Sequence, residues 1–263
     1  MQNGDNIPLV RTLRERCRTC YTCVRECPAK ASRIVDGQAE VLPQRCIGCG
    51  NCVRVCSQKA KQMLDSKDVV RDLLTGEKTV AAIIAPSFPA AFEWDTEQFI
   101  GTVKALGFDM VCEVAFGADL VADRYRKMLE ENPAERFIAT SCPAVVAYVE
   151  RYHPDLVPHL VPIVSPMIAE ARMLRQRHGQ DLEIVFIGPC IAKKGEAASD
   201  ILPDRIEAMT FIELQEMIDE ASIDPVDVTP RDFDPPVGGA GSLFAISRGM
   251  LQAANITEDL VDG

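Results

Sequence analysis

Hydrophobic and polar positions follow two different rhythms along the chain, and the change falls near residue 78. Beyond it, short apolar runs typical of buried strands alternate with longer segments in which apolar residues recur every three or four positions, as on a helix. The short runs predict strands at Thr79–Ala85, Met110–Val114, Phe137–Ala139 and Leu182–Ile187. The helical periodicity predicts helices at Thr96–Leu106, Ala118–Glu131, Ala144–Tyr152, Ser165–His178 and Phe211–Ala221. This alternation indicates an α/β domain over residues 78–263 with a mostly parallel sheet covered by helices.

Residues 1–66 lack that alternation and contain most of the cysteines of the chain. We expect them to form a separate small domain. Residues 67–77 are polar and helical in pattern, with Val70 and Leu73 on one side and Gly76 as a plausible stop. They are interpreted as the connector between the two domains.

Composition excludes several classes of protein. Of the 263 residues, 47% are hydrophobic and 25% charged, which is enough for a packed core. No apolar run approaches the roughly 20 residues that a membrane-spanning helix needs, and the N-terminus shows no secretory signal. We therefore expect a cytoplasmic protein without a membrane span. The 28 Lys and Arg against 39 Asp and Glu give a formal charge of −11, which argues against nucleic-acid binding because that requires neutralising phosphates.

Eight of the 11 cysteines form two copies of one pattern within residues 17–56. An odd number of cysteines in a reducing compartment argues against a disulfide framework and favours metal ligation. The copies are Cys17, Cys20, Cys23 and Cys27, followed by Cys46, Cys49, Cys52 and Cys56.

This spacing predicts two [4Fe–4S] clusters with crossed ligands. Three cysteines spaced two residues apart hold one cubane, and the fourth reaches across to the other cluster. The first cysteine set is then Cys17, Cys20, Cys23 and Cys56, and the second cysteine set is Cys46, Cys49, Cys52 and Cys27. Two structural zinc sites are the alternative, although these usually show separated cysteine pairs rather than runs of four. The segment resembles the two-cluster bacterial ferredoxins, which implies an α+β ferredoxin domain.

Charge is divided unevenly between the two domains. Residues 1–66 contain 11 Lys and Arg against 6 Asp and Glu, a net charge of +5, whereas the remainder carries −16. Two interpretations of the basic segment stay open, a solvated surface or a docking face for a redox partner such as an acidic ferredoxin or an oxidoreductase subunit. The arginines concerned are Arg11, Arg14, Arg16, Arg18 and Arg25.

Two of the remaining cysteines follow predicted strands. Cys142 comes after Phe137–Ala139, and Cys190 after Leu182–Ile187. Because sites in open α/β sheets gather at the carboxyl ends of strands, these two cysteines are predicted to converge on one metal site. Cys112 lies inside a predicted strand and is interpreted as a core residue.

The flanking residues resemble the [FeFe]-hydrogenase large-subunit family. Thr140–Pro143 (TSCP) is similar to its first cluster motif, Pro189–Glu196 (PCIAKKGE) to its second, and Gly238–Leu251 to a glycine-rich segment. Phe116–Leu120 and Ser165–Met167 match two further stretches. The resemblance implies that Cys142 and Cys190 bind the cubane of the catalytic H-cluster, that Lys193 faces the diiron ligands, that Glu196 lies on the proton route, and that Ser165 and Pro166 line the pocket.

The sequence also departs from that family. Its first motif has a second cysteine as proton donor, whereas Cys142 stands alone, and its next tryptophan is Val145 here. An acidic pair corresponds to Asp123-Arg124, and a proton-relay serine to Val161. The family's third motif, with the last two cysteines, is not found before Gly263. We therefore expect a partial third site that could hold a third [4Fe–4S] cluster, no diiron H-cluster in this chain, and no hydrogenase activity from the chain alone.

Three functions remain open at this point. The first is an iron–sulfur electron-transfer protein of the hydrogenase family, from its sensory or auxiliary branch, with two clusters and a degenerate third site. The second is a fragment of an active or hydrogen-sensing [FeFe]-hydrogenase. The third is a metal-free hydrogenase-like interaction module that carries a ferredoxin.

Overall fold

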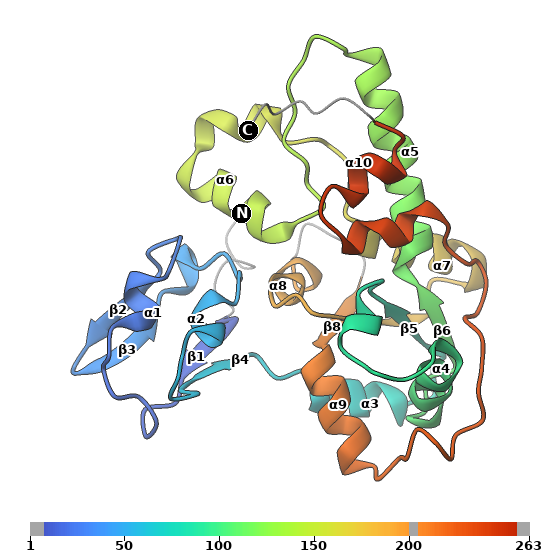
Figure 1. Ribbon diagram of the computed structural model, residues 1–263, viewed down its shortest axis with the longest axis horizontal. Coiled ribbons are helices and arrows are strands. Elements are labelled where there is room, and N and C mark those ends of the chain that lie inside the picture. The colour runs from blue at the N-terminus through green and yellow to red at the C-terminus, as the bar shows by residue number, and fades with distance from the viewer. Residues whose placement is uncertain (1–7, 200–204, 257–263) are drawn as a thin grey trace.

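The N-terminal unit is built from two small antiparallel sheets and two single-turn helices (Figure 1). The structure is a computed structural model that describes residues 8–199 and 205–256. One sheet pairs β1 with β4, and the other pairs β2 with β3. The elements are β1 (Val10–Thr12), α1 (Thr22–Arg25), β2 (Ser32–Val35), β3 (Gln38–Val41), η2 (Pro43–Arg45), α2 (Asn51–Arg54) and β4 (Lys61–Met63). The unit has the ferredoxin-like α+β organisation that the sequence predicted.

The second unit contains a four-stranded sheet in which every strand pair is parallel, as predicted. The order of the strands is β6-β5-β7-β8, so β5 is a central strand that pairs with β6 and β7. All five residues of β5 are buried, which fits a central strand covered on both faces. The strands are β5 (Val80–Ile84), β6 (Met110–Glu113), β7 (Glu183–Gly188) and β8 (Ile206–Thr210).

Helices surround this sheet and extend from it toward the ferredoxin-like unit (Figure 1). Long α5 packs along α7, and α6 reaches out from the body with α8 beneath it. The α-helices are α3 (Lys67–Leu74), α4 (Thr96–Ala105), α5 (Val114–Glu131), α6 (Pro143–Tyr152), α7 (Pro166–His178), α8 (Ala192–Ala197), α9 (Phe211–Glu220) and α10 (Gly249–Ala253). Short 3-10 helices are η3 (Phe88–Ala90), η4 (Pro154–His159) and η5 (Ala240–Ala245). No described helix is long and apolar enough to cross a membrane.

One predicted strand was wrong and several elements were missed. Phe137–Ala139 makes only an isolated bridge between Ile138 and Leu160, because no strand of the sheet lies beside it. Strand β8 was missed because Glu207 interrupts a short apolar run, and α8 and α10 are too short for a helical period to stand out. Helix α5 begins at Val114, directly after β6, rather than at Ala118.

The connector forms α3 and packs onto the second unit. Val70 is fully buried in the core of that unit, and Leu73 and Leu74 pack beside it. The predicted limits of the domains at residues 66 and 78 stay a prediction. Cys112 lies on β6 with no exposed surface, in agreement with its interpretation as a core residue. Burial raises its pKa to about 12 and so keeps the thiol neutral.

Candidate iron–sulfur centres

The four sulfurs of the first cysteine set surround one cavity in the ferredoxin-like unit. Its lining includes all four members of that set together with Lys61. Cys23 is buried, and burial raises the pKa of its thiol, with Cys56, Cys17 and Cys20 acting in the same direction. By contrast, the Thr22 hydroxyl 3.4 Å from Cys20 Sγ lowers the pKa of exposed Cys20. Four thiols that influence one another around a cavity are a suitable donor set for a cubane.

Members of the second cysteine set also lie close together, since Cys46 packs against the cluster that contains buried Cys27. Burial raises the pKa of Cys52 to about 12, and the neighbouring thiols of Cys46, Cys49 and Cys27 add to the rise. The same burial and the charges of Cys49 and Cys27 raise the pKa of Cys46. Thiols crowded in this way lose their protons only if a cation compensates the charge, as iron does when a cluster forms.

Backbone N–H groups point at sulfurs of both sets. The amide of Ala31 donates to Cys27 Sγ over 3.2 Å, and the equivalent amide of Ala60 in the second copy donates to Cys56 Sγ over 3.3 Å. Gly48 N–H lies 3.5 Å from Cys46 Sγ. Such donors stabilise thiolate sulfur and tune the potential of a bound cluster. Within the described residues, no three Cys, His, Asp or Glu side chains are arranged around the position of a single metal ion.

The second cysteine set lies against the second unit through two glycines. A Cβ built on Gly48 would lie 2.8 Å from the Cα of Ala192, and one on Gly50 would lie 3.1 Å from Ile191. Both contacted residues directly follow Cys190. The backbone around Cys46 and Cys49 therefore touches the segment that presents Cys190, as the neighbouring positions of α2 and α8 in Figure 1 also indicate.

Helix α6 covers the same set from another side. The Tyr152 hydroxyl lies 2.6 Å from the carbonyl oxygen of Ala29 and 2.9 Å from that of Arg45. Arg151 donates to the carbonyl oxygens of Pro43 and Cys46. Tyr148 and Tyr152 pack on a small cluster formed by Cys27, Ala29, Ala31 and Ile47. The second cysteine set thus has α6 on one side and the segment after Cys190 on another.

Cys142 lies at the start of α6 and Cys190 follows β7, just before α8, and these two helices pack against each other. Cys142 is the exposed N-cap residue of α6, and it follows the isolated bridge rather than the strand that the sequence predicted. Burial raises the pKa of Cys190, the N–H groups of Lys193 and Ala192 and the Lys193 ammonium act against that rise, and Cys142 adds to it. The two thiols therefore share one electrostatic environment that has amide donors and a cation.

Lys193 and Glu196 form one ion pair beside Cys190. Lys193 Nζ lies 2.6 Å from Glu196 Oε2, and the two side chains are 9% and 16% exposed. The separate roles that the family resemblance implies for these two residues stay a prediction. Ser165 caps α7 and is 2% exposed, and its hydroxyl meets no hydrogen-bond partner among the described atoms.

Asp123 and Val161, which the resemblance matches to the family's proton route, lie in different surroundings. Asp123 pairs with Arg126 and Lys127 on the solvent side of α5, and these cations lower its pKa. Val161 is 2% exposed and packs with Tyr125 in an apolar cluster. Apolar side chains at such a position cannot pass a proton.

Family models match both units of the chain. Residues 78–262 match the C-terminal domain of the iron-only hydrogenase large subunit, and residues 9–57 match a 4Fe-4S dicluster domain. The chain belongs to the iron-only hydrogenase large-subunit family. As a family member with a dicluster domain, it is a hydrogenase-like iron–sulfur protein.

Among individual proteins, iron hydrogenase 1 of Clostridium pasteurianum is 30% identical over 71% of this chain and 38% of its own length. The periplasmic [Fe] hydrogenase large subunit of Nitratidesulfovibrio vulgaris is 29% identical, over 95% of this chain and 68% of that protein. The cytosolic Fe-S cluster assembly factor NAR1 of Yarrowia lipolytica is 29% identical over 49% of this chain and 30% of its own. The chain therefore spans well under half of the first and third relatives.

Solved structures support the same fold. An apo [FeFe]-hydrogenase from Chlamydomonas reinhardtii superposes with a TM-score of 0.61 at 22% identity, covering 73% of this chain and 58% of the other.

Several buried charged residues were not singled out from the sequence, and three of them bear on the site and its surroundings. Lys61 lies within the first cysteine set, Lys194 joins the connector to the body, and Glu170 is enclosed between α5 and α7. Only Lys61 could have been noticed from the sequence, since the internal repeat makes it the equivalent of Ser32, 29 residues earlier. Nothing local marks the other two, because tertiary packing alone buries them.

Proposed function

We propose that the chain relays electrons through two [4Fe–4S] clusters, one on each crossed cysteine set. A bound cluster supplies one-electron redox chemistry at low potential. Cys17, Cys20, Cys23 and Cys56 would hold the outer cluster, and Cys27, Cys46, Cys49 and Cys52 the inner one. The observation that supports the proposal is the cavity lined by Cys17, Cys20 and Cys23 of the first copy together with Cys56 of the second.

The order of the centres in this relay is inferred from the packing of Gly48 on Ala192. That contact brings the inner set beside Cys190, and Tyr148 and Tyr152 exclude water from its other side. Electron transfer between centres slows steeply with distance, so backbone contact between two ligand segments favours exchange between them. Electrons would pass between the outer set, the inner set and the Cys142–Cys190 site.

The Cys142–Cys190 site supplies two thiol ligands toward a third [4Fe–4S] cluster. Two amide donors and the Lys193 ammonium near Cys190 suit a negatively charged group. The remaining ligands of such a cluster would come from outside the described residues. With Val161 and Asp123 placed as they are, we propose that the described part of the chain does not by itself evolve or oxidise hydrogen.

The deciding experiment is anaerobic reconstitution followed by iron analysis and EPR of the reduced protein. Two clusters correspond to about eight irons per chain and a third adds about four. Cys20→Ala should lose one cluster and destabilise the ferredoxin-like unit, since ligation and folding are coupled. Cys112→Ala is the matched control and should keep the full iron content, because Cys112 lies in the core of the other unit.

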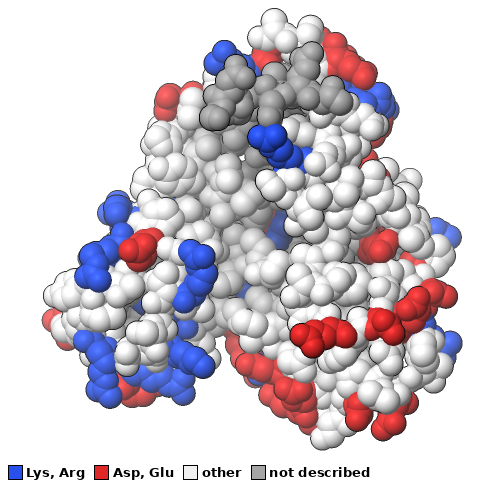
Figure 2. All heavy atoms as spheres, viewed as in Figure 1, with Lys and Arg blue, Asp and Glu red and all other residues white. Residues whose placement is uncertain are grey.

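Each alternative has its own outcome in these measurements. A chain that takes up no iron, or takes up zinc in its place, would refute the relay and favour an interaction module. Hydrogen turnover with reduced viologen after maturation, clearly above that of Cys190→Ala, would favour an active hydrogenase fragment. We propose a cytoplasmic location. We also propose an acidic redox partner, which the Lys and Arg side chains on the ferredoxin-like unit support (Figure 2).

A further inference from the structure

One lysine is buried in the ferredoxin-like unit, where removing an ammonium group from water is costly. Lys61 begins β4 and is 5% exposed. Its ammonium lies 2.6 Å from Thr12 Oγ1 on the paired strand β1. No salt bridge is formed by Lys61 within the described residues. A buried cation without an anion is costly unless something else supplies the negative charge.

The thiols of both cysteine sets are the groups that Lys61 acts on. It lines the cavity enclosed by Cys17, Cys20, Cys23 and Cys56. Strand β4, which Lys61 begins, also packs against α2, the helix that carries Cys52 of the other set. Lys61 therefore lies close enough to influence both sets at once.

The internal repeat shows that this position is chemically special. Ala31 and Ala60 occupy equivalent places, each donating its N–H to the fourth cysteine of its own copy. The next residue is Ser32 in the first copy and Lys61 in the second, and both are buried. The two halves thus share a backbone arrangement, but only one introduces a charge.

We propose that Lys61 is a shared counter-charge for the two clusters, raising both of their reduction potentials. The proposal rests on the proposed function, since it requires clusters on both sets. On reduction, each cluster takes one electron from an external donor such as dithionite, and its charge with four thiolates goes from about −2 to about −3. A fixed positive charge in a poorly solvated position stabilises the more negative state. Thr12 would hold the ammonium in place through its hydroxyl.

The test is a potentiometric EPR titration of the full chain after reconstitution. We expect Lys61→Met to shift both midpoint potentials to more negative values, with the reduction equilibrium constant falling at least about tenfold, equivalent to about 59 mV for one electron. Lys61→Arg should keep most of the potential because it keeps the charge. Thr12→Val should cause a smaller negative shift, because the ammonium loses its anchor and not its charge.

Lys59→Met is the matched control. Lys59 is two residues away, carries the same charge and is exposed, so its effect should be small and should fade as salt is added. The shift from Lys61→Met should persist at high salt because its site is buried.

The possible outcomes distinguish a failure of the Lys61 proposal from a failure of the proposed electron relay. Equal shifts in Lys61→Met and Lys59→Met, or a shift of one cluster only, would overturn the shared role while leaving the relay intact. A wild-type chain without iron would overturn both. Should Lys61→Met fail to assemble clusters, Lys61→Gln and Thr12→Val supply the same comparison, and unmoved potentials in both would overturn the proposal.

Discussion

The second copy of the cysteine repeat has glycine at positions 48 and 50, where the first copy has Thr19 and Tyr21. Comparing the two copies explains why glycine is needed there. Gly48 and Gly50 have φ angles of +69° and +73°, and the equivalent Thr19 and Tyr21 adopt +53° and +63°. Left-handed backbone is therefore tolerated with a side chain in the exposed copy. Only the second copy lies against Ala192 and Ile191, where no Cβ fits at position 48. Close packing on the body, rather than backbone angle alone, explains the glycine.

Gly48→Ala should accordingly destabilise the protein more than an alanine placed at an open glycine. Both sites incur about 1–2 kcal/mol for left-handed alanine, but position 48 adds about 1–3 kcal/mol of overpacking. Gly37→Ala is the control, since Gly37 has a φ of +73° and nothing within 4 Å of a built Cβ. Chemical unfolding of the iron-loaded variants under anaerobic conditions measures the difference. Equal losses would show that the contact with Ala192 contributes nothing.

Glu170 gives a second prediction at the scale of one residue. It has no exposed surface, and neither carboxyl oxygen meets a hydrogen-bond partner within the described chain. Burial raises its pKa from 4.5 to about 8, the nearby Gly117 backbone acts against that rise, and Glu113 adds to it. Between these values the folded protein holds the proton while the unfolded chain has released it. Wild-type stability should therefore fall as the pH rises from about 4.5 to about 8.

Glu170→Gln should remove that pH dependence. The variant should be more stable than wild type near pH 8, by at most about 5 kcal/mol, and the gain should shrink toward pH 5. Urea unfolding at a series of pH values measures it, with exposed Glu150→Gln as control. No gain in stability at pH 8 would mean that Glu170 is ionised and compensated in the folded protein.

Residues differ in how far the sequence alone reveals them. The cysteine spacing predicts both crossed sets because ligand geometry ties local spacing to a cluster, and that assignment of ligands stays a prediction. Glu170 and Lys194 could not be predicted, since their burial depends on helices that are distant in sequence. The same holds for the contact of Gly48 with Ala192, which joins segments 144 residues apart.

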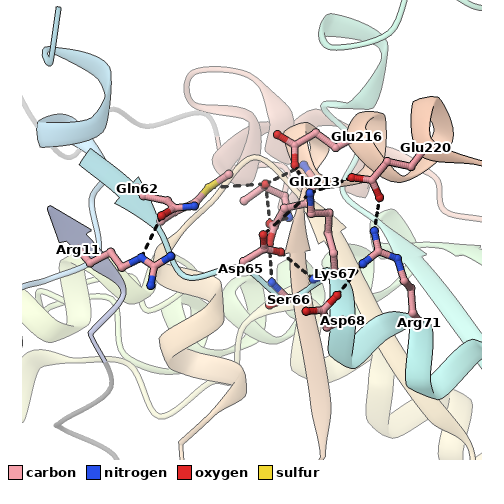
Figure 3. A network of polar contacts seen from close by, with 12 residues as sticks. Arg11, Gln62, Asp65, Ser66, Lys67, Asp68, Arg71, Glu213, Glu216 and Glu220 are labelled. Atoms are coloured by element: carbon pink, nitrogen blue, oxygen red, sulfur yellow. Dashed lines mark hydrogen bonds and ion pairs between the residues drawn. The ribbon is translucent and has the colours of Figure 1, made fainter. Parts of the chain in front are cut away.

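At the scale of elements, a buried polar network fastens α3 to the body (Figure 3). Lys194 on α8 donates to Ser66 Oγ over 2.8 Å, to Ala208 O over 3.0 Å and to Glu213 Oε1 over 2.8 Å. The Ser66 N–H donates to the same carboxylate over 2.7 Å, and Thr210 completes a capping box with Glu213. All three ammonium donors are used, so the buried charge is fully compensated. The network fixes the chain where it leaves the ferredoxin-like unit.

Lys194→Met should cost about 3–5 kcal/mol of unfolding free energy, because it leaves the buried Glu213 carboxylate without its cation. Adding Glu213→Gln should recover part of that loss. Arg71→Met provides the control, since Arg71 is 42% exposed in its pairs with Asp68 and Glu220 and such pairs contribute at most about 1 kcal/mol. A Lys194→Met loss no larger than that of the control would contradict this account.

Elements with a clear period were predicted well, and short ones were not. Helices α4, α6, α7 and α9 begin and end within about two residues of their predicted limits. Strand β8 and helices α8 and α10 are five or six residues long, and their conformation depends on neighbours. Helix α8 matters most among them, because it carries Lys193 and Lys194 and receives Gly48.

At the scale of the whole molecule, charge separates along the line between the two units. Lys and Arg gather on the ferredoxin-like unit, and Asp and Glu form patches mainly on the lower part of the body (Figure 2). Arg18 lines the cavity of the first cysteine set, and Arg25 donates to the carbonyl oxygen of Cys20 over 3.4 Å. The outer set therefore opens on a positive surface. That arrangement suits an acidic electron carrier, which would be attracted to one end of the molecule and repelled by the other.

Electron exchange with an acidic ferredoxin should therefore depend on salt and on these two arginines. The double variant Arg18→Glu with Arg25→Glu should lower the second-order rate constant about tenfold or more at low ionic strength, and the difference should largely disappear near 1 M salt, where the screening length falls to about 3 Å. Stopped-flow mixing of the reduced carrier with the oxidised protein measures the rate.

The matched control reverses two exposed cations on α5, Arg124→Glu and Lys127→Glu. This double variant changes the net charge by the same amount, but its two positions lie on the body. If both double variants slow the reaction alike, net charge alone governs the encounter. If neither does, the arginines form only a solvated surface, and the carrier docks elsewhere.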